Sequence, residues 1–314
     1  MRRPTQLPPH LASAPFTMAE ARDAGVTPGK LRHREIVHLC RGIARTADDG
    51  GTDLALLVRP YSVVTGHCAA SHATAFAIWD FPGFLPQHVD EGIHIARQYP
   101  HGIPRRTGVT GHRTHLRGDE VECLAGLWIT TRIRTWLDCA RRMSVDELTV
   151  VADHLLRIPR PEFEGRSEPY ATVGEFAALL ERHRGTPGIR KARLALEQAR
   201  VGSDSAPETR LRLALVRAGL PEPALNTAVE LAGGASRQPD QSFAQYQVAV
   251  EYEGAGHAAP EQVARDIDRE EDYARAGWIQ VRISKRHMDN EARAAVAKVR
   301  RALASRGWNP TVRQ

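Results

Sequence analysis

The sequence predicts an α/β protein, α+β overall, with a helical module at the N-terminus, a mixed middle region and a C-terminal mixed sheet flanked by helices. Two observations predict this class. Helical and strand-like periodicities alternate along the 314 residues, and the last third follows the order helix, strand, strand, helix, strand. The composition, 42% hydrophobic and 25% charged, is that of a folded globular chain long enough for two or three domains.

Changes in composition and in hydrophobic periodicity divide the chain into four parts. We expect a winged helix-turn-helix module over residues 1–50, a mixed α/β region over 51–160, a helical linker region over 161–204 and the C-terminal domain over 205–314. The boundary after residue 160 is predicted because the sequence there is polar and rich in proline.

The N-terminal module has the pattern of a helix-turn-helix. Thr17 and Glu20 form a capping box at the start of one helix, and Gly25 stands where that helix ends. A second helix begins at Thr27, and a short basic strand over residues 39–45 is a candidate wing.

Positive charge is concentrated in the same module. The first 45 residues contain eight Arg and Lys against three Asp and Glu, a net charge of +5, whereas the whole chain carries +6 with a pI of about 9.4. Such a surface suits phosphate backbones, and Arg32 and Arg34 are the candidate DNA contacts. The alternative is a basic face that only contacts solvent.

Periodicity and capping signals predict the remaining elements. In the middle and linker regions we expect helices near residues 69–79, 132–142, 145–157, 173–183 and 189–199, and strands near 92–96 and 126–131. In the C-terminal domain we expect a helix ending at Gly219, strands near 229–244, 247–253 and 278–283, and helices near 261–276 and 291–304.

Other features exclude several classes of protein. No run approaches eighteen apolar residues, which excludes a membrane-spanning helix, and prolines follow the first basic residues where a secretory signal needs an apolar run. We therefore expect a cytoplasmic protein. The four cysteines, at positions 40, 68, 123 and 139, form no CxxC pair and are interpreted as ordinary thiols.

Acidic residues gather around the two central strands of the C-terminal domain. Asp240 opens one strand, and Glu251 and Glu253 share one face of the next because strand side chains alternate. In a hairpin, Asp240 lies beside Glu251, and a hard cation such as Mg²⁺ relieves the repulsion between such carboxylates. The alternative is a solvent-facing strand with two glutamates.

Glu208 has two interpretations. It stands three residues after Ser205, in a capping box that begins the first helix of the C-terminal domain. It is also a candidate third carboxylate for the metal.

A series of ordered motifs carries a family resemblance. From Glu208 to Ile283 the chain resembles the Vsr-like branch of the PD-(D/E)xK endonucleases, whose fold is that of the restriction endonucleases. The matching residues are Glu208-Thr209-Arg210-Leu211-Arg212, Ala218-Gly219-Leu220-Pro221, Pro239-Asp240, Val250-Glu251-Tyr252-Glu253-Gly254, His257, Arg265-Asp266, Arg269, Gly277-Trp278 and Val281-Arg282. The N-terminal module is similar to the winged helix-turn-helix of AbiEi-type antitoxins, a combination found in actinobacterial proteins.

The resemblance implies roles for individual residues. Asp240 and Glu251 would bind Mg²⁺ or Mn²⁺. Glu253 stands in the position that is lysine in the usual motif, and because a carboxylate cannot donate protons as an ammonium does, the mechanism departs from the family pattern there. His257, in the loop that follows, is a candidate general base or a loop residue without a role.

Basic residues near these carboxylates have alternatives of their own. Arg265 and Arg269 lie one helical turn apart and either clamp phosphate or form salt bridges with acidic neighbours. Arg282 or Lys285 is a candidate replacement for the missing lysine charge.

Three candidate functions remain, from different classes. The first is a Mg²⁺-dependent DNA endonuclease that its N-terminal module brings to DNA. The second is an antitoxin-like DNA-binding regulator whose nuclease fold is weakly active or silent, with a toxin or another defence-system protein as partner. A scaffold with neither activity is the third, since a fold does not guarantee its function.

Overall fold

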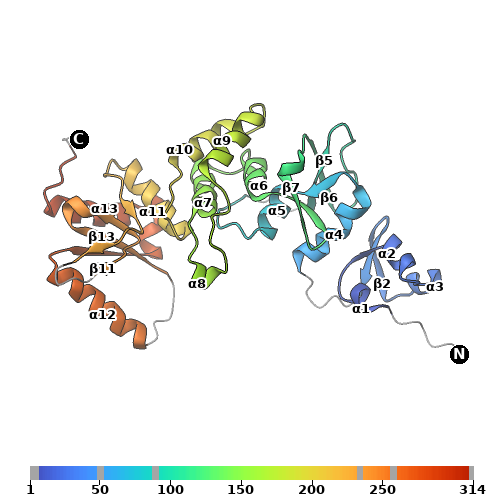
Figure 1. The fold of residues 1–314 in the computed structure, drawn as a ribbon, viewed down its shortest axis with the longest axis horizontal. Helices are drawn as coiled ribbons and strands as arrows, with labels where there is room; N and C mark the ends of the chain where they lie inside the picture. Colours follow the sequence, from blue (N-terminus) through green and yellow to red (C-terminus); the bar gives the residue numbers. More distant parts are fainter. Residues whose placement is uncertain (1–6, 48–52, 87–91, 232–235, 255–259, 311–314) are drawn as a thin grey trace. The chain divides into compact units, whose positions relative to one another are not determined.

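The computed structural model describes residues 7–47, 53–86, 92–231, 236–254 and 260–310, with side chains in the last range from Asp268 onward. The chain forms two compact units (Figure 1). The first comprises Met1–Met143 and Leu179–Ile189, and the second comprises Ser144–Ala178 and Arg190–Gln314. The boundary predicted at residue 160 therefore lies inside the second unit.

The first unit begins with a small helical module and a three-stranded antiparallel sheet. The capping box is confirmed, since the Thr17 hydroxyl accepts from the Glu20 amide while the Glu20 carboxylate accepts from the Thr17 amide. The predicted wing strand is a hairpin, because Gly42, with φ +87°, turns the chain. The elements are α1 (Pro9–Ala12), β1 (Phe16–Thr17), α2 (Met18–Asp23), α3 (Pro28–Leu31), β2 (Ile36–Cys40) and β3 (Ile43–Thr46), and the sheet order is β1-β3-β2.

A five-stranded mixed sheet follows in the same unit, in the order β6-β5-β4-β8-β7. Strands β4 and β8 run parallel, as do β5 and β6, and the other neighbours are antiparallel. The elements are α4 (Leu54–Thr65), β4 (Cys68–Ala70), α5 (His72–Ile78), β5 (Ile93–Gln98), β6 (Val109–Thr114), the 3₁₀ turn η1 (Gly118–Glu120), β7 (Val121–Leu124), β8 (Leu127–Thr130) and α6 (Arg132–Cys139).

Periodicity and capping signals predict β5, β8 and α6. They do not predict the helix α4 or the strands β4, β6 and β7. The helix predicted from residue 69 starts at His72 instead, because Cys68–Ala70 pairs with β5. These strands are short and lack a clean alternation of apolar and polar residues, which is the signal that periodicity analysis needs.

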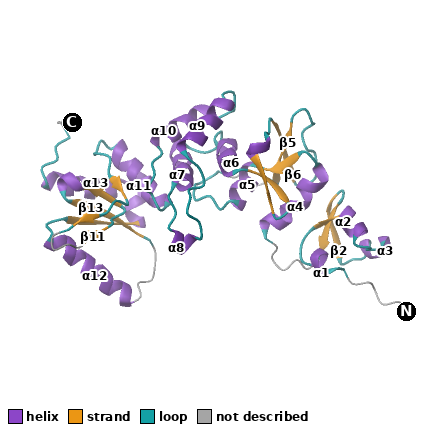
Figure 2. Ribbon diagram, viewed as in Figure 1, coloured by secondary structure: helices purple, strands orange, loops and turns teal. Residues whose placement is uncertain are grey.

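The second unit is built on a four-stranded mixed sheet in the order β14-β13-β12-β9. Helices cover both faces of this sheet (Figure 2). The elements are α7 (Val145–Leu156), α8 (Pro161–Glu164), α9 (Val173–Arg182, which ends in the first unit), α10 (Ile189–Gln198), α11 (Ala206–Arg217), β9 (Ala224–Leu225), β10 (Val229–Glu230), β11 (Ser236–Arg237), β12 (Gln241–Phe243), η2 (Ala244–Tyr246), β13 (Val248–Glu253), α12 (Pro260–Arg275), β14 (Ile279–Ser284), η3 (Lys285–Met288) and α13 (Asp289–Ser305).

Alternation along β13 sets the two faces of this sheet. Val248 and Val250 pack into the main core with residues of α11, β14 and α13. Ala249 lies on the opposite face, where it contacts Tyr273 of α12 in a second, smaller core. The predicted order of helices and strands and the mixed sheet are confirmed, and the glutamates of β13 lie on the α12 face.

One predicted strand, residues 229–244, is wrong as a single element. The segment forms three short strands: β10 and β11 pair with each other as a separate two-stranded sheet, and only β12 joins the main sheet. The predicted linker region 161–204 contains three helices.

A buried ion pair holds α7 against α11. The Asp153 carboxylate, fully buried, accepts from the Arg212 guanidinium at 2.8 Å, from the Thr209 hydroxyl at 3.0 Å and from the Arg200 amide at 2.7 Å. Both members of the Asp153–Arg212 pair are at most 2% exposed. Every donor and acceptor in the group comes from the second unit.

No helix in the described part of the chain is both long and apolar enough to cross a membrane.

Candidate active site in the second unit

The candidate site lies where β12 and β13 meet beneath α12. We call Glu208, Asp240, Glu251 and Glu253 the acidic cluster. Asp240 directly precedes β12, and because Gln241 pairs with Val250, the antiparallel register sets Asp240 opposite Glu251. The Asp240 carboxylate accepts a hydrogen bond of 2.6 Å from the Tyr252 amide, which fixes it against β13.

Glu208 serves the helix cap that its sequence predicts. Its carboxylate accepts from the Ser205 hydroxyl at 2.7 Å and from the Asp204 amide at 2.9 Å, and Asn226 adds a longer contact of 3.3 Å. Glu208 is nevertheless close enough for its charge to act on Asp240. It is thus both a cap and a neighbour of the candidate metal ligands.

Glu251 faces α12 and contacts two of its side chains. The Arg269 guanidinium donates to Glu251 at 2.8 Å, and the Glu251 side chain is only 13% exposed. Tyr273, one helical turn further on, is buried, and burial together with the Glu251 charge raises the pKa of its hydroxyl. Of the alternatives for Arg269, the structure shows an ion pair, with Glu251 as the partner.

Glu253 and Arg282 form a second ion pair. Arg282 lies on β14, where the parallel register sets it opposite Glu251, and its guanidinium donates to the Glu253 carboxylate. Both side chains are about two-fifths exposed, so water reaches this pair. A positive charge from the neighbouring strand therefore lies beside the position where the usual motif has lysine.

Asp240 is the electrostatic centre of the cluster. Burial, together with the nearby charges of Glu208 and Glu251, raises the pKa of its carboxyl to about 7, although the Tyr252 amide and Arg269 act in the opposite direction. Burial also raises the pKa of Glu208. A carboxylate in this environment is stabilised by a bound proton or by a cation.

The donor set suits a hard divalent ion. Mg²⁺ and Mn²⁺ take oxygen ligands, and one or two carboxylates with several waters are sufficient for Mg²⁺. Asp240 and Glu251 are the residues that would hold it, with Glu208 behind them. Arg269 competes with such an ion for Glu251.

The remaining predicted site residues lie elsewhere or outside the described chain. His257 and the side chain of Arg265 are outside the described residues. Arg32 ends α3 and Arg34 follows it, both exposed on the N-terminal module of the first unit. Lys285 is exposed in η3, which follows β14.

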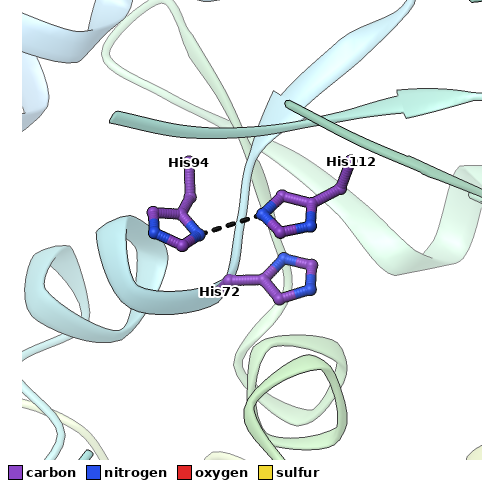
Figure 3. Close-up of side chains that lie close together, drawn as sticks. All are labelled: His72, His94 and His112. Atoms are coloured by element: carbon purple, nitrogen blue, oxygen red, sulfur yellow. Dashed lines mark hydrogen bonds between the residues drawn. The ribbon is translucent and has the colours of Figure 1, made fainter. Parts of the chain in front are cut away.

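A second cluster of chemically active side chains was not predicted from the sequence. His72, His94 and His112 converge in the first unit (Figure 3). They stand 22 and 18 residues apart in the sequence, which matches no short metal-binding motif. In addition, His112 lies on β6, a strand that the sequence does not predict. The high histidine content, 14 residues, is the one sequence signal that points toward them.

Comparisons with known proteins supply relatives but no assigned activity. No family model matches the chain. Two proteins of Mycobacterium tuberculosis, the uncharacterized proteins Rv2248 and MT2308, are each 29% identical to it over 240 residues, which is 76% of this chain and 82% of the relative. The function must therefore be argued from the residues of the site.

Proposed function

We propose that this protein is a Mg²⁺-dependent DNA endonuclease, with Mn²⁺ as an alternative metal. One observation carries the proposal: Asp240, directly before β12, lies opposite Glu251 of β13, with Glu208 close enough to raise the pKa of Asp240. Two ionised carboxylates that face each other across a hairpin repel, which raises the free energy of the folded state. A divalent cation bound between them makes the arrangement favourable.

The bound ion would supply an activated water and stabilise charge on the phosphate oxygens. Asp240 and Glu251 would hold that ion, and the Tyr252 amide fixes the Asp240 carboxylate against β13. Arg269 and Arg282 present positive charge beside the carboxylates, where a phosphodiester would approach. In this arrangement Arg282 takes over the electrostatic role of the lysine that the motif lacks.

The N-terminal module supports DNA as the substrate class. Arg32 and Arg34 are exposed at the end of α3, and the module carries most of the net charge of the chain. These side chains can contact phosphates of duplex DNA without reading its sequence.

Plasmid cleavage in Mg²⁺ tests the proposal. Asp240→Asn keeps an oxygen that accepts from the Tyr252 amide but removes the charge, so the fold should survive. We expect it to lower the cleavage rate at least about 100-fold, since metal stabilisation of the transition state is worth several kcal/mol. Glu270→Gln, an exposed carboxylate on α12, is the matched control and should cleave at the parent rate. Parent-level cleavage by Asp240→Asn would refute the proposal.

A DNA-binding regulator is the second candidate, and the ion pairs favour it. Glu251 and Glu253 are each paired with an arginine of the same chain, which is compatible with a silent nuclease fold. This candidate predicts DNA binding that survives Asp240→Asn, no cleavage by the parent protein, and loss of binding when residues 1–45 are removed.

A further inference from the structure

Three histidine rings meet on one face of the five-stranded sheet, at a distance in sequence from every residue of the acidic cluster. His94 lies on β5 and His112 on β6, and the register that pairs Ala96 with His112 sets both rings on the same face. His72, the first residue of α5, stacks on His112 with ring centroids 3.7 Å apart (Figure 3).

The nitrogens of the three rings are close enough to share one ion. One ring nitrogen from each lies within 4.8 Å of the other two, and His94 Nδ1 and His112 Nε2 are 2.9 Å apart. Two nitrogens on one tetrahedral zinc, each about 2.0–2.1 Å from the metal, are about 3.3 Å apart. The His94 and His112 nitrogens would therefore move apart by a few tenths of an ångström, and the His72 nitrogen would come closer by up to about 1.5 Å, to reach a coordinating arrangement.

The three histidines also border a cavity of about 640 Å³. Asp138 lines the same cavity, and its side chain is only 5% exposed. One carboxylate oxygen accepts from Arg134 at 2.9 Å, but the other, Oδ2, has no hydrogen-bond partner among the described residues. A buried carboxylate oxygen without a donor indicates that a ligand or water belongs in this cavity.

We propose that His72, His94 and His112 form a binding site for a zinc-class divalent transition metal, with a fourth coordination position open to this cavity. Three imidazoles suit zinc, whereas Mg²⁺ prefers oxygen ligands. Three protein ligands with one open position are the arrangement in which zinc keeps a water or binds an anion. Asp138 Oδ2 is positioned on the same cavity to accept a hydrogen bond from that water.

The histidine environment fits this assignment. His94 is 3% exposed and held in the sheet, so its ring is fixed before the metal binds. The Ser71 hydroxyl lies 3.0 Å from His72 Nδ1, and such a contact to the second nitrogen orients a coordinating imidazole. The site is independent of the proposed nuclease, because its residues all belong to the first unit.

Zinc titration of the chelator-treated, full-length protein by calorimetry tests the site, with excess Mg²⁺ present to occupy the acidic cluster. We expect one zinc per chain. His112→Ala should weaken zinc binding by at least about 100-fold, because loss of a residue that only supports a ligand already costs 10- to 100-fold. His101→Ala, from the stacked pair His67–His101 in the same unit, should leave the affinity unchanged.

Two results would overturn the proposal: no zinc binding by the folded parent protein, or parent-level zinc affinity in folded His112→Ala. If His112→Ala does not fold, imidazole NMR signals of the parent protein decide the matter. Zinc should then perturb the signals of His72, His94 and His112 together, and perturbation confined to other histidines would contradict the site. Asp240→Asn should bind zinc as the parent does, which separates this test from that of the nuclease.

Discussion

The acidic cluster and the histidine cluster show two different ways of assembling ligand-type side chains. In the acidic cluster, Asp240 and Glu251 are brought together by a single hairpin, and their charges repel. In the histidine cluster, the three imidazole rings come from the first residue of α5 and from the parallel strands β5 and β6. They hydrogen-bond and stack on one another, and a neutral imidazole does not repel its neighbours.

The difference determines what each cluster needs. Carboxylates that are close together are stabilised by protons, arginines or a hard cation, and the acidic cluster has Arg269 and Arg282 beside it. Imidazoles need no compensating charge and select softer transition metals. One chain therefore carries two candidate metal centres with different expected metals.

The largest effect should come from a buried carboxylate whose role is structural. Asp153→Ala removes three hydrogen bonds and leaves Arg212 buried without its partner. We expect a loss of about 3–5 kcal/mol in the free energy of unfolding, measured by urea denaturation. Asp268→Ala, on an exposed position of α12, is the control and should change stability by less than about 0.5 kcal/mol. If Asp153→Ala were as stable as the control, Asp153 would not have the structural role that its three hydrogen bonds indicate.

The next largest effect should be the pH dependence of the Mg²⁺ affinity of the acidic cluster, which the histidine cluster should not share. Since the pKa of Asp240 is raised to about 7, a proton competes with the metal below that pH. The apparent Mg²⁺ affinity should fall by up to about tenfold per unit as pH drops from 7 to 5 and should be nearly constant from pH 8 to 9. Calorimetry at each pH measures this. An affinity independent of pH between 5 and 8 would mean that Asp240 is not a ligand.

Arg269 should have a smaller influence on the same site. Its ion pair with Glu251 is partly exposed, the arginine being 43% accessible, so it is worth at most about 1 kcal/mol. Arg269→Gln frees Glu251 for the metal, and Mg²⁺ affinity at pH 8 should rise about two- to fivefold. Arg275→Gln, a salt-bridged arginine on the same helix, is the matched control. A fall in affinity would show that Arg269 supports metal binding.

The smallest effects are expected in the N-terminal module. Arg32→Ala and Arg34→Ala each remove one candidate phosphate contact, and each should reduce the slope of log affinity against log salt concentration by about 0.9. Fluorescence anisotropy with duplex DNA at several salt concentrations measures the slope. Arg184→Ala, a 73% exposed arginine outside the module, should leave it unchanged. Equal slopes for all variants would remove the module from the DNA interface.

Local signals in the sequence predicted local structure well. The capping box at Thr17 and the caps at Ser144 and Ser205 are present, because a cap depends on residues three apart. Asp240 and Glu251 are joined by one hairpin, so alternation and register bring them together.

Long-range geometry could not be predicted in the same way. The partner of Arg269 is Glu251, which depends on how α12 crosses back over the sheet. The histidine cluster depends on parallel pairing of β5 with β6 and on where α5 begins, and none of these leaves a periodic signal in the sequence. Sites assembled from distant short strands therefore need the three-dimensional structure.

The most direct measurement of the central claim is Mg²⁺ binding by calorimetry at pH 8, on the parent protein and on Asp240→Asn, with His112→Ala as a second variant. We predict saturable Mg²⁺ binding that Asp240→Asn weakens at least about 100-fold, because loss of a residue that only supports a ligand already costs 10- to 100-fold, and that His112→Ala leaves intact. Equal Mg²⁺ binding by the parent and folded Asp240→Asn would contradict the claim that the acidic cluster is a metal centre.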